Sequence, residues 1–481
     1  MTKYEMVVGL EVHCQLATRT KLFCGCGTDG YGETPNSRIC PVCTAQPGSL
    51  PVLNAKAVEL AFRAALALEC RLNPVSVFAR KNYFYPDLPK AYQISQYDKP
   101  FSEHGRLRLS EGGKTVGITR IHLEEDAGKL LHDLGALKID GSLVDLNRAG
   151  VPLIEIVSEP DIRTGDEAHA YLAALKEVLQ YVGASRCDME KGEMRCDANV
   201  SVRPEGAQRF GTRAEIKNLN SFKNVKDAID HEFHRQVAVV ESGGRVVQET
   251  RLWDAAKGET RSMRSKEDAH DYRYFPDPDL PPLVADESLV ARLKAEMPEL
   301  PAARRARLTA QLGLTAYDAE VLTGDRALAD FFETAAAAAP KGAAKTVANL
   351  LSTEMLARLN AESLPPSQAP IAPEHLGRLA GLVVAGTLSS KGAKDVFARM
   401  WQTRKDPVEL VSELGLAQVS DDGALREWVR QAVASNPKAA ADLKGGKDAA
   451  IGSLVGAVMK LSGGKANPAA VRGLIKEAVQ S

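Results

Sequence analysis

Acidic and imidazole side chains alternate with apolar ones in a segment near the start of the chain. In YEMVVGLEVHCQL, the two-residue period of a β-strand places Glu11 and His13 on one face and Leu10, Val12 and Cys14 on the other. The strand is therefore expected to pack through its apolar face and to present a carboxylate and an imidazole on the reverse.

Three further segments show the same alternation of acidic and apolar residues. RIHLEED, MRCDANVSV and TRAEIKN each place carboxylates on one strand face. In RIHLEED the period places Glu124 and Asp126 on that face and leaves Glu125 free at the strand end, and the other two segments contribute Asp197 and Glu215. If the four polar faces converge, they form an oxygen-rich site with one imidazole, a donor set that suits Mg²⁺ bound to a nucleotide. The alternative is that each face is simply solvated, which is common for polar strand faces.

Cationic residues lie close in sequence to these acids. Lys81 and Lys90 begin and end KNYFYPDLPK. Arg195 lies in MRCDANVSV, and Lys217 lies in TRAEIKN. A metal ion together with Lys and Arg is what phosphoryl transfer needs, because catalysis of that reaction consists mostly of stabilising charge on the phosphoryl oxygens. The sequence has neither a GxxxxGK[ST] motif nor a GxGxxG motif that opens a helix, so ATP chemistry requires another kind of cradle.

Four of the eight cysteines fall within residues 24 to 43. Cys24 and Cys26 form one close pair, and Cys40 and Cys43 form another. Two such pairs across a loop match a four-thiolate structural Zn²⁺ site, in which the metal folds the loop. Two alternatives stay open, namely buried free thiols and redox chemistry at the second pair. The other four cysteines lie in apolar patterns, and we expect them in the core.

Composition restricts the class of protein. The chain has 481 residues, a formal net charge of −1 and a mean hydropathy of −0.20, so any affinity for nucleic acid must come from a local patch. It has no run of 18 or more apolar residues and no secretory signal pattern. We therefore expect a soluble, cytoplasmic protein without a membrane partner. At about 150 residues per domain, its length predicts roughly three domains.

A proline-rich stretch, PDPDLPPL, predicts a domain boundary near residue 290. Before it, strand patterns alternate with amphipathic helices, which predicts an α+β domain over 1–290 with one large antiparallel or mixed sheet. After it the chain is rich in alanine and other helix formers. This composition predicts an all-α helical domain over 291–408 and a small helical tail domain over 409–481.

The end of the tail is the most basic part of the chain. Residues 435–481 carry seven Lys and Arg against three Asp and Glu. Lys447 and Lys465 each follow two glycines, and Lys460 lies between them in the sequence. Such lysines suit an RNA phosphate backbone, although a solvated helix face has the same composition. No aromatic residue accompanies them within this stretch, so base-specific recognition is not expected there.

Taken in order, many stretches of the first 283 residues resemble the family of B subunits of the aspartyl/glutamyl-tRNA(Asn/Gln) amidotransferase. They are VVGLEVHCQL, ICPVCTAQPGSLPVLN, RKNYFYPDLPKAYQISQYD, RIHLEEDAGK, DLNRAGVPLIEIVSEPD, MRCDANVSVRP, AEIKNLNSF and DYRYFPDPDLPPL. The alanine-rich middle and IGSLVGAVMKLSGGKANPAAVRGLI resemble that family's helical and tail domains, so the resemblance covers essentially the whole chain.

The resemblance implies a fold and a reaction. The first domain of that family is an antiparallel-sheet cradle similar to the glutamine synthetase core. The family binds a misacylated tRNA and uses ATP and Mg²⁺ to phosphorylate the aminoacyl side-chain carboxylate. Ammonia then displaces phosphate and gives Gln-tRNA(Gln) or Asn-tRNA(Asn). The ammonia comes through a tunnel from a glutaminase partner, the A-type (amidase) subunit, while a small C-type subunit holds the pair together.

The resemblance also implies roles for individual residues. Metal and ATP-site groups would be Glu11, His13, Glu124, Glu125, Asp197 and Glu215. Lys81 and Lys90 would contact phosphate or carboxylate or line the tunnel mouth, and Arg195 and Lys217 would assist nucleotide binding. Which of Glu124 and Glu125 is the metal ligand stays open, as does whether Asp-tRNA(Asn), Glu-tRNA(Gln) or both is the substrate, and whether a non-discriminating aminoacyl-tRNA synthetase joins the complex.

Two rival interpretations remain at this point. One is a non-catalytic tRNA-binding scaffold, in which the cysteine loop and basic tail hold RNA and the acids are surface groups. The other is a free-standing carboxylate–amine ligase for a small molecule, which the basic tail disfavours. The position of the acids in three dimensions distinguishes surface groups from a site.

Overall fold

The structure is a computed structural model that describes residues 3–109, 113–134, 137–265, 271–417, 422–463 and 465–480. Contacts divide the chain into two compact units, Met1–Ala302 and Ala303–Ser481. The first contains strands and helices and the second is helical, so the predicted α+β class is confirmed. Leu293 of α4 (Glu287–Ala295) lies in the core of the first unit. The predicted divisions at 290 and 408 stay predictions.

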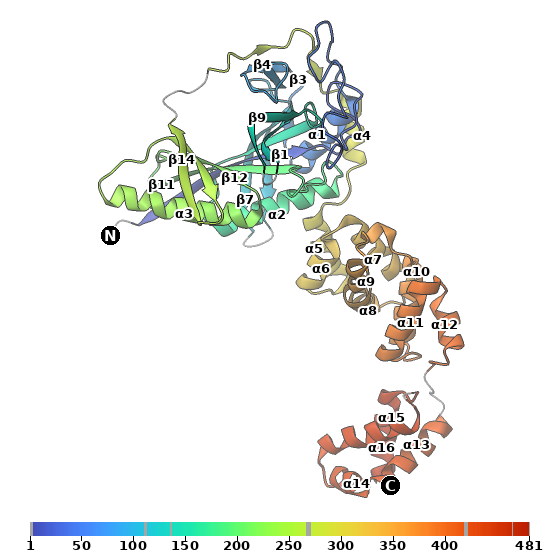
Figure 1. Cartoon of the computed structure of the whole chain (residues 1–481). Coiled ribbons are helices and arrows are strands. Elements are labelled where there is room, and N and C mark those ends of the chain that lie inside the picture. Colours follow the sequence, from blue (N-terminus) through green and yellow to red (C-terminus); the bar gives the residue numbers. More distant parts are fainter. Residues whose placement is uncertain are drawn as a thin grey trace. The chain divides into compact units, whose positions relative to one another are not determined.

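A nine-stranded sheet forms the centre of the first unit (Figure 1). Its strands run in the order β14-β13-β12-β11-β1-β10-β7-β6-β2, so the middle strands come from distant parts of the chain. All neighbours pair antiparallel except β12 and β13, which are parallel. The strands are β1 (Tyr4–Gln15), β2 (Arg71–Leu72), β6 (Ser102–Arg108), β7 (Thr115–Glu125), β10 (Pro152–Ser158), β11 (Met194–Pro204), β12 (Ala214–Leu219), β13 (Glu249–Asp254) and β14 (Glu259–Ser265).

One face of this sheet is apolar and is covered by helices. On β1, the predicted alternation is confirmed, since Val8, Leu10, Val12 and Cys14 have no exposed surface. They pack with α1 (Ala55–Ala67), α2 (Gly165–Tyr181) and α3 (Phe222–Glu241) in one core, and Figure 1 shows α2 and α3 beneath the sheet. Burial of this face leaves the opposite, polar face of the middle strands available for chemistry.

Local signals fix where these helices begin. Asn54 accepts hydrogen bonds from the backbone N–H groups of the first turn of α1, and Thr164 and Ser221 do the same for α2 and α3. Such caps satisfy donors that a helix cannot pair internally.

The four cysteines that the sequence places in the core, Cys14, Cys70, Cys187 and Cys196, are all buried.

Smaller sheets flank the polar face of the large sheet. β4 (Ala79–Asn82) lies between β5 (Tyr92–Ser95) and β15 (Phe275–Pro276), so the proline-rich stretch begins by adding a short strand to the first unit. β3 (Val75–Ser76) pairs with β16 (Leu283–Val284), and β8 (Lys129–Leu134) pairs with β9 (Leu137–Asp145).

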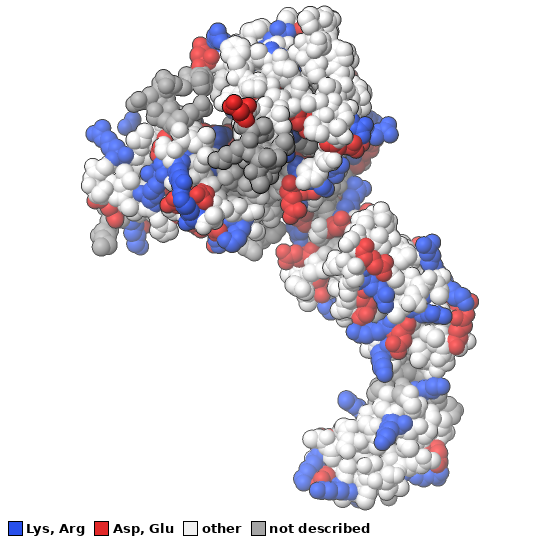
Figure 2. Space-filling view, in the orientation of Figure 1, with Lys and Arg blue, Asp and Glu red and all other residues white. Residues whose placement is uncertain are grey.

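The second unit holds two separate apolar cores. The first core is built from α5 to α12, and the second from α13 to α16. These helices are α5 (Pro301–Leu312), α6 (Ala316–Thr323), α7 (Arg326–Ala338), α8 (Ala344–Leu350), α9 (Leu356–Ala361), α10 (Pro373–Val384), α11 (Ser390–Thr403), α12 (Pro407–Glu413), α13 (Asp422–Ser435), α14 (Pro437–Lys444), α15 (Ile451–Leu461) and α16 (Pro468–Gln480). In Figure 2, side chains of both charge signs are scattered over this unit.

The predicted apolar stripes of the last two helices are confirmed. Leu454 and Val458 of α15 pack with Val471 and Ile475 of α16 in the second core, and none of the four has exposed surface. Within the described part of the chain, no helix combines the length and the apolar character needed to cross a membrane.

Candidate active site on the polar face of the sheet

Cross-strand pairing gathers titratable side chains into a row across the middle of the sheet. His13 of β1 lies opposite Arg195 of β11 on one side and Glu155 of β10 on the other. Glu155 in turn lies opposite His122 of β7. Directly opposed residues of antiparallel strands point to the same face with their Cβ atoms about 5 Å apart. Four strands thus bring these groups together although the sequence separates them widely.

A second row lies two residues further along the same strands. Glu11 of β1 lies opposite Asp197 of β11. Asn199, also on β11, lies opposite Glu215 of β12. Asn199 donates a side-chain hydrogen bond to Glu11 Oε1 at 2.9 Å. The structure therefore places Glu11, Asp197 and Glu215 side by side on the polar face.

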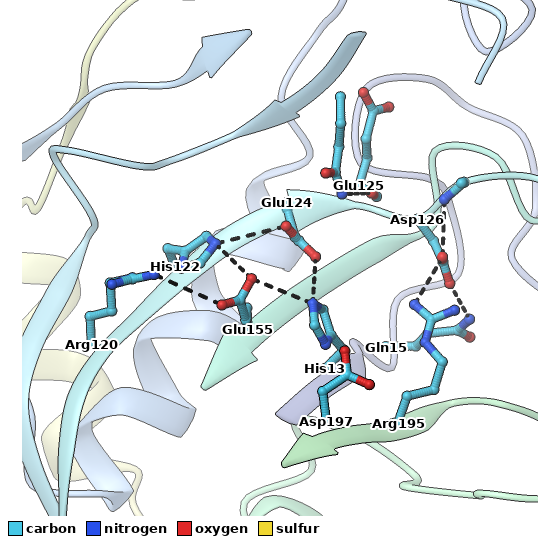
Figure 3. A network of polar contacts seen from close by, with 12 residues as sticks. His13, Gln15, Arg120, His122, Glu124, Glu125, Asp126, Glu155, Arg195 and Asp197 are labelled. Atoms are coloured by element: carbon cyan, nitrogen blue, oxygen red, sulfur yellow. Dashed lines mark hydrogen bonds and ion pairs between the residues drawn. The ribbon is translucent and has the colours of Figure 1, made fainter. Parts of the chain in front are cut away.

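His13 and Glu155 of the first row converge with Glu124, which lies two residues after His122 on β7 (Figure 3). His13 Nε2 lies 3.4 Å from Glu124 Oε1 and 3.4 Å from Glu155 Oε2, and the three ligand atoms lie within 4.8 Å of one another. Two carboxylates and one imidazole form a donor set that a divalent cation accepts. His122 Nε2 lies 3.4 Å from the same Glu155 oxygen and so borders this set.

The pKa values of this cluster reflect its burial and its mixed charges. Burial lowers the pKa of His122, but the Glu155 and Glu124 carboxylates outweigh it and raise that pKa to about 9. Burial likewise opposes a rise in the pKa of His13, where Glu155 and Glu124 again prevail. Burial raises the pKa of Glu155, whereas the two imidazoles hold it well below its usual range. The carboxylates that offer a cation site thus also favour the protonated form of the two imidazoles.

The second row is an acidic cluster with a single lysine inserted in it. Lys217 Nζ lies 2.5 Å from Asp197 Oδ2 and 3.0 Å from Glu215 Oε1. Both carboxylates raise the pKa of Lys217 against the opposing effect of burial. Burial raises the pKa of Glu11, and the carboxylates of Glu155, Glu215 and Asp197 raise it further. The carboxylates around Glu11 repel one another, and a bound cation would offset that repulsion.

A cavity of about 320 Å³ adjoins the second row. Its lining includes Glu11 and Asn199 together with Phe210, Gly211 and Arg213. Phe210 is 58% exposed and the Arg203 guanidinium lies 5.2 Å from its ring centroid. An aromatic ring and an arginine beside a cation site are the groups that bind the base and the phosphates of a nucleotide.

The two adjacent glutamates at the end of β7 point to different partners. Glu124 faces His13 and His122, whereas Glu125 Oε2 accepts a 2.5 Å hydrogen bond from Lys90 and Glu125 Oε1 accepts one from the Ile94 backbone. Lys90 and Glu125 also line a cavity of about 250 Å³ that reaches the cysteine loop. Glu124 thus belongs to the candidate cation site, and Glu125 belongs to an ion pair beside it.

Of the predicted cationic residues, Arg195 borders the carboxylate clusters and Lys81 lies on another sheet. Arg195 donates to Asp126 Oδ1 at 3.0 Å, and Gln15 donates to the other oxygen of Asp126 at 2.9 Å. Lys81 lies on β4, with its Nζ 4.9 Å from the ring centroid of Tyr272 and 5.7 Å from that of Tyr83. Arg195 therefore borders the site through Asp126, and Lys81 lies among aromatic rings.

The four loop cysteines meet in one cluster. Their sulfur atoms lie within 4.8 Å of one another, and Cys40 Sγ and Cys43 Sγ are 3.9 Å apart. A tetrahedral Zn²⁺ site with Zn–S bonds of about 2.3 Å requires sulfur separations of about 3.8 Å. A hydrogen bond from the Cys24 thiol lowers the pKa of Cys43, and the backbone N–H of Cys40 and the charge of Lys21 assist. The geometry and donor set fit a zinc ion.

The three predicted tail lysines are exposed. Lys447 precedes a 3₁₀ turn, Lys460 lies in the last turn of α15 and Lys465 lies just before α16. Lys447 Nζ lies 2.9 Å from Asp442. Exposed lysines close to a helical core are compatible with phosphate contacts, and their role stays a prediction.

Sequence reasoning missed Glu155, which lies at the centre of the candidate cation site with His13 and Glu124. Its segment, VPLIEIVSEP, is apolar enough to indicate a strand buried on both faces, for which the two-residue period selects no polar face. The signal was a single acid in the middle of an apolar strand, since such a charge is buried only with partners. The contact of His122 with Glu155 likewise depends on the pairing between β7 and β10, which the strand period does not give.

Comparison with known proteins identifies the family of the chain. Residues 6–291 match the family model described as GatB/GatE catalytic domain, and residues 330–479 match the one described as GatB domain. Three relatives are named as the B subunit of the aspartyl/glutamyl-tRNA(Asn/Gln) amidotransferase. The protein of Carboxydothermus hydrogenoformans is 53% identical over 481 residues, with 99% of each chain covered. That of Geobacter sulfurreducens is 55% identical over 476 residues, with 98% of each covered. That of Myxococcus xanthus is 52% identical over 480 residues, with 99% of each covered.

The match extends over both units, and each of the three relatives is identical at more than half of the aligned positions. The chain belongs to the family of B subunits of the aspartyl/glutamyl-tRNA(Asn/Gln) amidotransferase.

Proposed function

We propose that this chain is the member of a tRNA-dependent amidotransferase complex that activates the side-chain carboxylate of Glu-tRNA(Gln), Asp-tRNA(Asn) or both, using ATP. The observation that carries the proposal is the convergence of His13, Glu124 and Glu155 beside the acidic row of Glu11, Asp197 and Glu215. The names of its relatives support the same assignment.

The chemistry explains why a phosphoryl-transfer site is needed. A carboxylate resists attack by ammonia because its carbon is electron-rich and its leaving group would be an oxide. In the proposed reaction, a side-chain carboxylate oxygen attacks the γ-phosphorus of ATP and ADP leaves. Ammonia then attacks the acyl carbon, phosphate departs with that oxygen, and the ammonia-derived nitrogen loses a proton to give the amide. Activation thus replaces an unreactive oxygen with a good leaving group.

The residues present fit Mg²⁺ bound to ATP. His13, Glu124 and Glu155 would hold one ion, and Glu11, Asp197 and Glu215 offer a second group of oxygens. Bound Mg²⁺ neutralises charge on the phosphate oxygens. Lys217 adds a fixed positive charge between Asp197 and Glu215, and the 320 Å³ cavity with Phe210 and Arg213 offers room for the nucleotide. We interpret the sheet as a cradle similar to that of glutamine synthetase.

The Lys90–Glu125 ion pair lies where ammonia would enter the site. The pair lines the 250 Å³ cavity, which shares no lining residue with the 320 Å³ cavity proposed for the nucleotide, so we assign the entry of ammonia to this cavity. We assign the ammonia source to a glutaminase (amidase) partner and the assembly to a small third partner. We assign the compartment to the cytoplasm, where misacylated tRNA and the non-discriminating synthetase that makes it are found. Lys81 is assigned to the same mouth.

We assign a structural role to zinc at Cys24, Cys26, Cys40 and Cys43. Four thiolates fill a tetrahedral ion and leave no position for water or substrate. The ion would therefore hold the loop against the cavity that Lys90 lines, without taking part in the reaction.

We assign tRNA binding to the tail through Lys447, Lys460 and Lys465. Deleting residues 410–481 is expected to weaken tRNA affinity and to reduce its salt dependence, because each lost phosphate contact lowers the slope of log affinity against log salt by about 0.9 for a duplex. ADP release at saturating tRNA would stay largely intact. Equal affinity of the full and shortened chains at several salt concentrations would contradict this assignment.

An amidation assay tests the function. The chain is purified with its amidase and small partners and supplied with Glu-tRNA(Gln) or Asp-tRNA(Asn), ATP, Mg²⁺ and ammonium chloride. Glu11→Gln and Glu124→Gln are expected to lower product formation about a hundredfold or more, as removal of transition-state charge stabilisation does. Glu205→Gln is the matched control, because Glu205 is an exposed glutamate outside the site. Undiminished product in the first two variants would leave the chain as a tRNA-binding scaffold.

A further inference from the structure

Five tyrosines form a continuous chain of ring contacts outside the carboxylate clusters. In contact order they are Tyr97, Tyr274, Tyr272, Tyr83 and Tyr85, and we call this set the tyrosine platform. Tyr97 and Tyr274 are stacked, with centroids 4.3 Å apart and planes inclined by 11°. The remaining contacts are edge-to-face, at centroid distances of 6.0 to 6.1 Å. The rings come from two segments that lie far apart in the sequence.

The platform is accessible from outside. Tyr97 is 54% exposed although one face of its ring lies on Tyr274, so its other face is open. Tyr85 is 57% exposed, and Phe84 beside it is 73% exposed. Monomeric proteins rarely leave this many large rings uncovered in one place without a binding role. The cation of Lys81 lies within 4.9 Å of the Tyr272 ring centroid, so the platform combines rings with positive charge.

The platform lies next to the candidate cation site. Gln96, the residue before Tyr97, accepts a 3.1 Å hydrogen bond from the backbone N–H of Leu123, the residue before Glu124. The phenol of Tyr274 lies within electrostatic reach of the same site. Its pKa is raised by burial and then by the Glu124 and Glu155 carboxylates. If the reacting carboxylate of a substrate lies at Glu124, the rest of that substrate can therefore extend to the Tyr97 ring.

We infer that the tyrosine platform stacks the unpaired 3′-terminal bases of the tRNA and so positions the attached amino acid at the cation site. This inference rests on the proposed function, because the amino acid that carries the reacting side-chain carboxylate is esterified to the last ribose of the tRNA. Base stacking on aromatic rings tolerates any sequence and contributes about 1–3 kcal/mol per base. It suits an enzyme that accepts two different tRNAs through the 3′ end they share.

The test measures tRNA affinity of the complex of this chain with its amidase and small partners. Each protein is titrated with complete tRNA(Gln) and with tRNA(Gln) lacking its three 3′-terminal nucleotides. The wild type is expected to prefer the complete tRNA by about tenfold or more, the equivalent of one stacked base. Tyr97→Ala is expected to lose most of that preference, and Tyr97→Phe to keep it, because phenylalanine retains the ring. Tyr317→Ala is the matched control, since Tyr317 lies on α6 and is 73% exposed.

A second readout works on the same proteins. 2-Aminopurine at the terminal position of the tRNA is quenched on stacking, so binding to the wild type and to Tyr97→Phe is expected to quench it, and binding to Tyr97→Ala is not. Preservation of both the preference and the quenching in Tyr97→Ala would overturn the inference. An equal loss of affinity for both tRNAs in Tyr97→Ala would also overturn it. Loss of the amidase partner with the tRNA preference intact would overturn it too, because the platform would then be a protein contact.

The two levels of the argument fail separately. A wild-type complex that neither binds nor amidates charged tRNA overturns the proposed function together with the inference. A wild-type complex that amidates it, while Tyr97→Ala keeps its preference for the complete 3′ end, overturns the inference alone.

Discussion

The Arg80–Asp277 ion pair ties the end of the tyrosine platform to the rest of the first unit. Arg80 of β4 donates from Nε to Asp277 Oδ2 at 3.0 Å, and the Asp277 side chain has no exposed surface. The same guanidinium lies 2.9 Å from Asp279, whose side chain is 34% exposed. One arginine thus makes a buried pair and a half-exposed pair, which allows a matched comparison.

Replacing Arg80 by alanine leaves the buried carboxylate of Asp277 without its cation. Breaking a buried pair in this way costs about 3–5 kcal/mol, whereas a solvent-exposed pair such as the one with Asp279 contributes about 0–1 kcal/mol. At about 1.4 kcal/mol per factor of ten, Arg80→Ala is expected to raise local opening at least about a hundredfold, and Asp279→Ala less than about tenfold.

Hydrogen exchange measured by mass spectrometry reads this opening directly. The Asp277 N–H donates to the Phe78 carbonyl at 2.8 Å, so peptides that cover residues 275–280 report on the attachment of β15 to its neighbours. Faster exchange confined to these peptides in Arg80→Ala, with Asp279→Ala close to wild type, is the expected result. Equal exchange in the two variants would refute the assignment of the buried pair as the main tie.

Three further predictions concern the site and the cysteine loop. Glu155→Gln is expected to lower amidation about a hundredfold, with Glu205→Gln unchanged, and activity close to wild type would remove Glu155 from the site. Cys43→Ser is expected to lose the one zinc ion per chain that metal analysis finds in the wild type, while Cys70→Ser keeps it; a zinc-free wild type would disprove the site. In metal-free buffer, the unfolding free energy of the first unit is expected to fall by about 3 kcal/mol between about pH 6.5 and pH 9, because the carboxylates of Glu155 and Glu124 overcome burial and raise the His122 pKa to about 9. A raised pKa stabilises the fold fully below the unfolded value of 6.5, and this stabilisation is lost as the pH rises through the folded value. Urea titrations of the wild type and of His122→Gln test this, and an equal pH slope in both would contradict it.

Periodicity alone predicted the faces of individual strands. The sequence YEMVVGLEVHCQL indicated which side of β1 is buried, and the structure confirms it, because a strand that packs through one face must alternate. The α+β class and the family were likewise accessible from the sequence. The same period assigns Glu11, His13, Glu124, Asp197 and Glu215 to polar strand faces without any knowledge of strand pairing.

Strand order and register were not accessible from the sequence. β1 lies between β10 and β11, so the partners of His13 are Glu155 and Arg195, more than 140 residues along the chain. Period-two reasoning assigns a face but not a neighbour, which is why the centrality of Glu155 was missed. The same limit applies to Lys81, which pattern placed with the acids and which pairing places on the small sheet among tyrosines.

The tyrosine platform shows the same limit at longer range. Tyr83 and Tyr272 are in edge-to-face contact at 6.0 Å because Asn82 pairs its backbone with the Tyr272 carbonyl. The sequence marks the lysines that begin and end KNYFYPDLPK but not its tyrosines, and no pattern there predicts their contact with Tyr272 and Tyr274. Only the fold brings the two runs of aromatic residues together beside Glu124.

The transfer of one oxygen atom tests the central claim most directly. Glutamate labelled with ¹⁸O in its side-chain carboxylate is attached to tRNA(Gln) and converted by the complex with ATP, Mg²⁺ and ammonium chloride. Carboxylate attack on the γ-phosphorus, as we propose at the His13, Glu124 and Glu155 cluster, predicts that each inorganic phosphate released with the amide carries one ¹⁸O atom. Amide formation with unlabelled phosphate would contradict the account, because the carboxylate oxygen would then never have bonded to phosphorus.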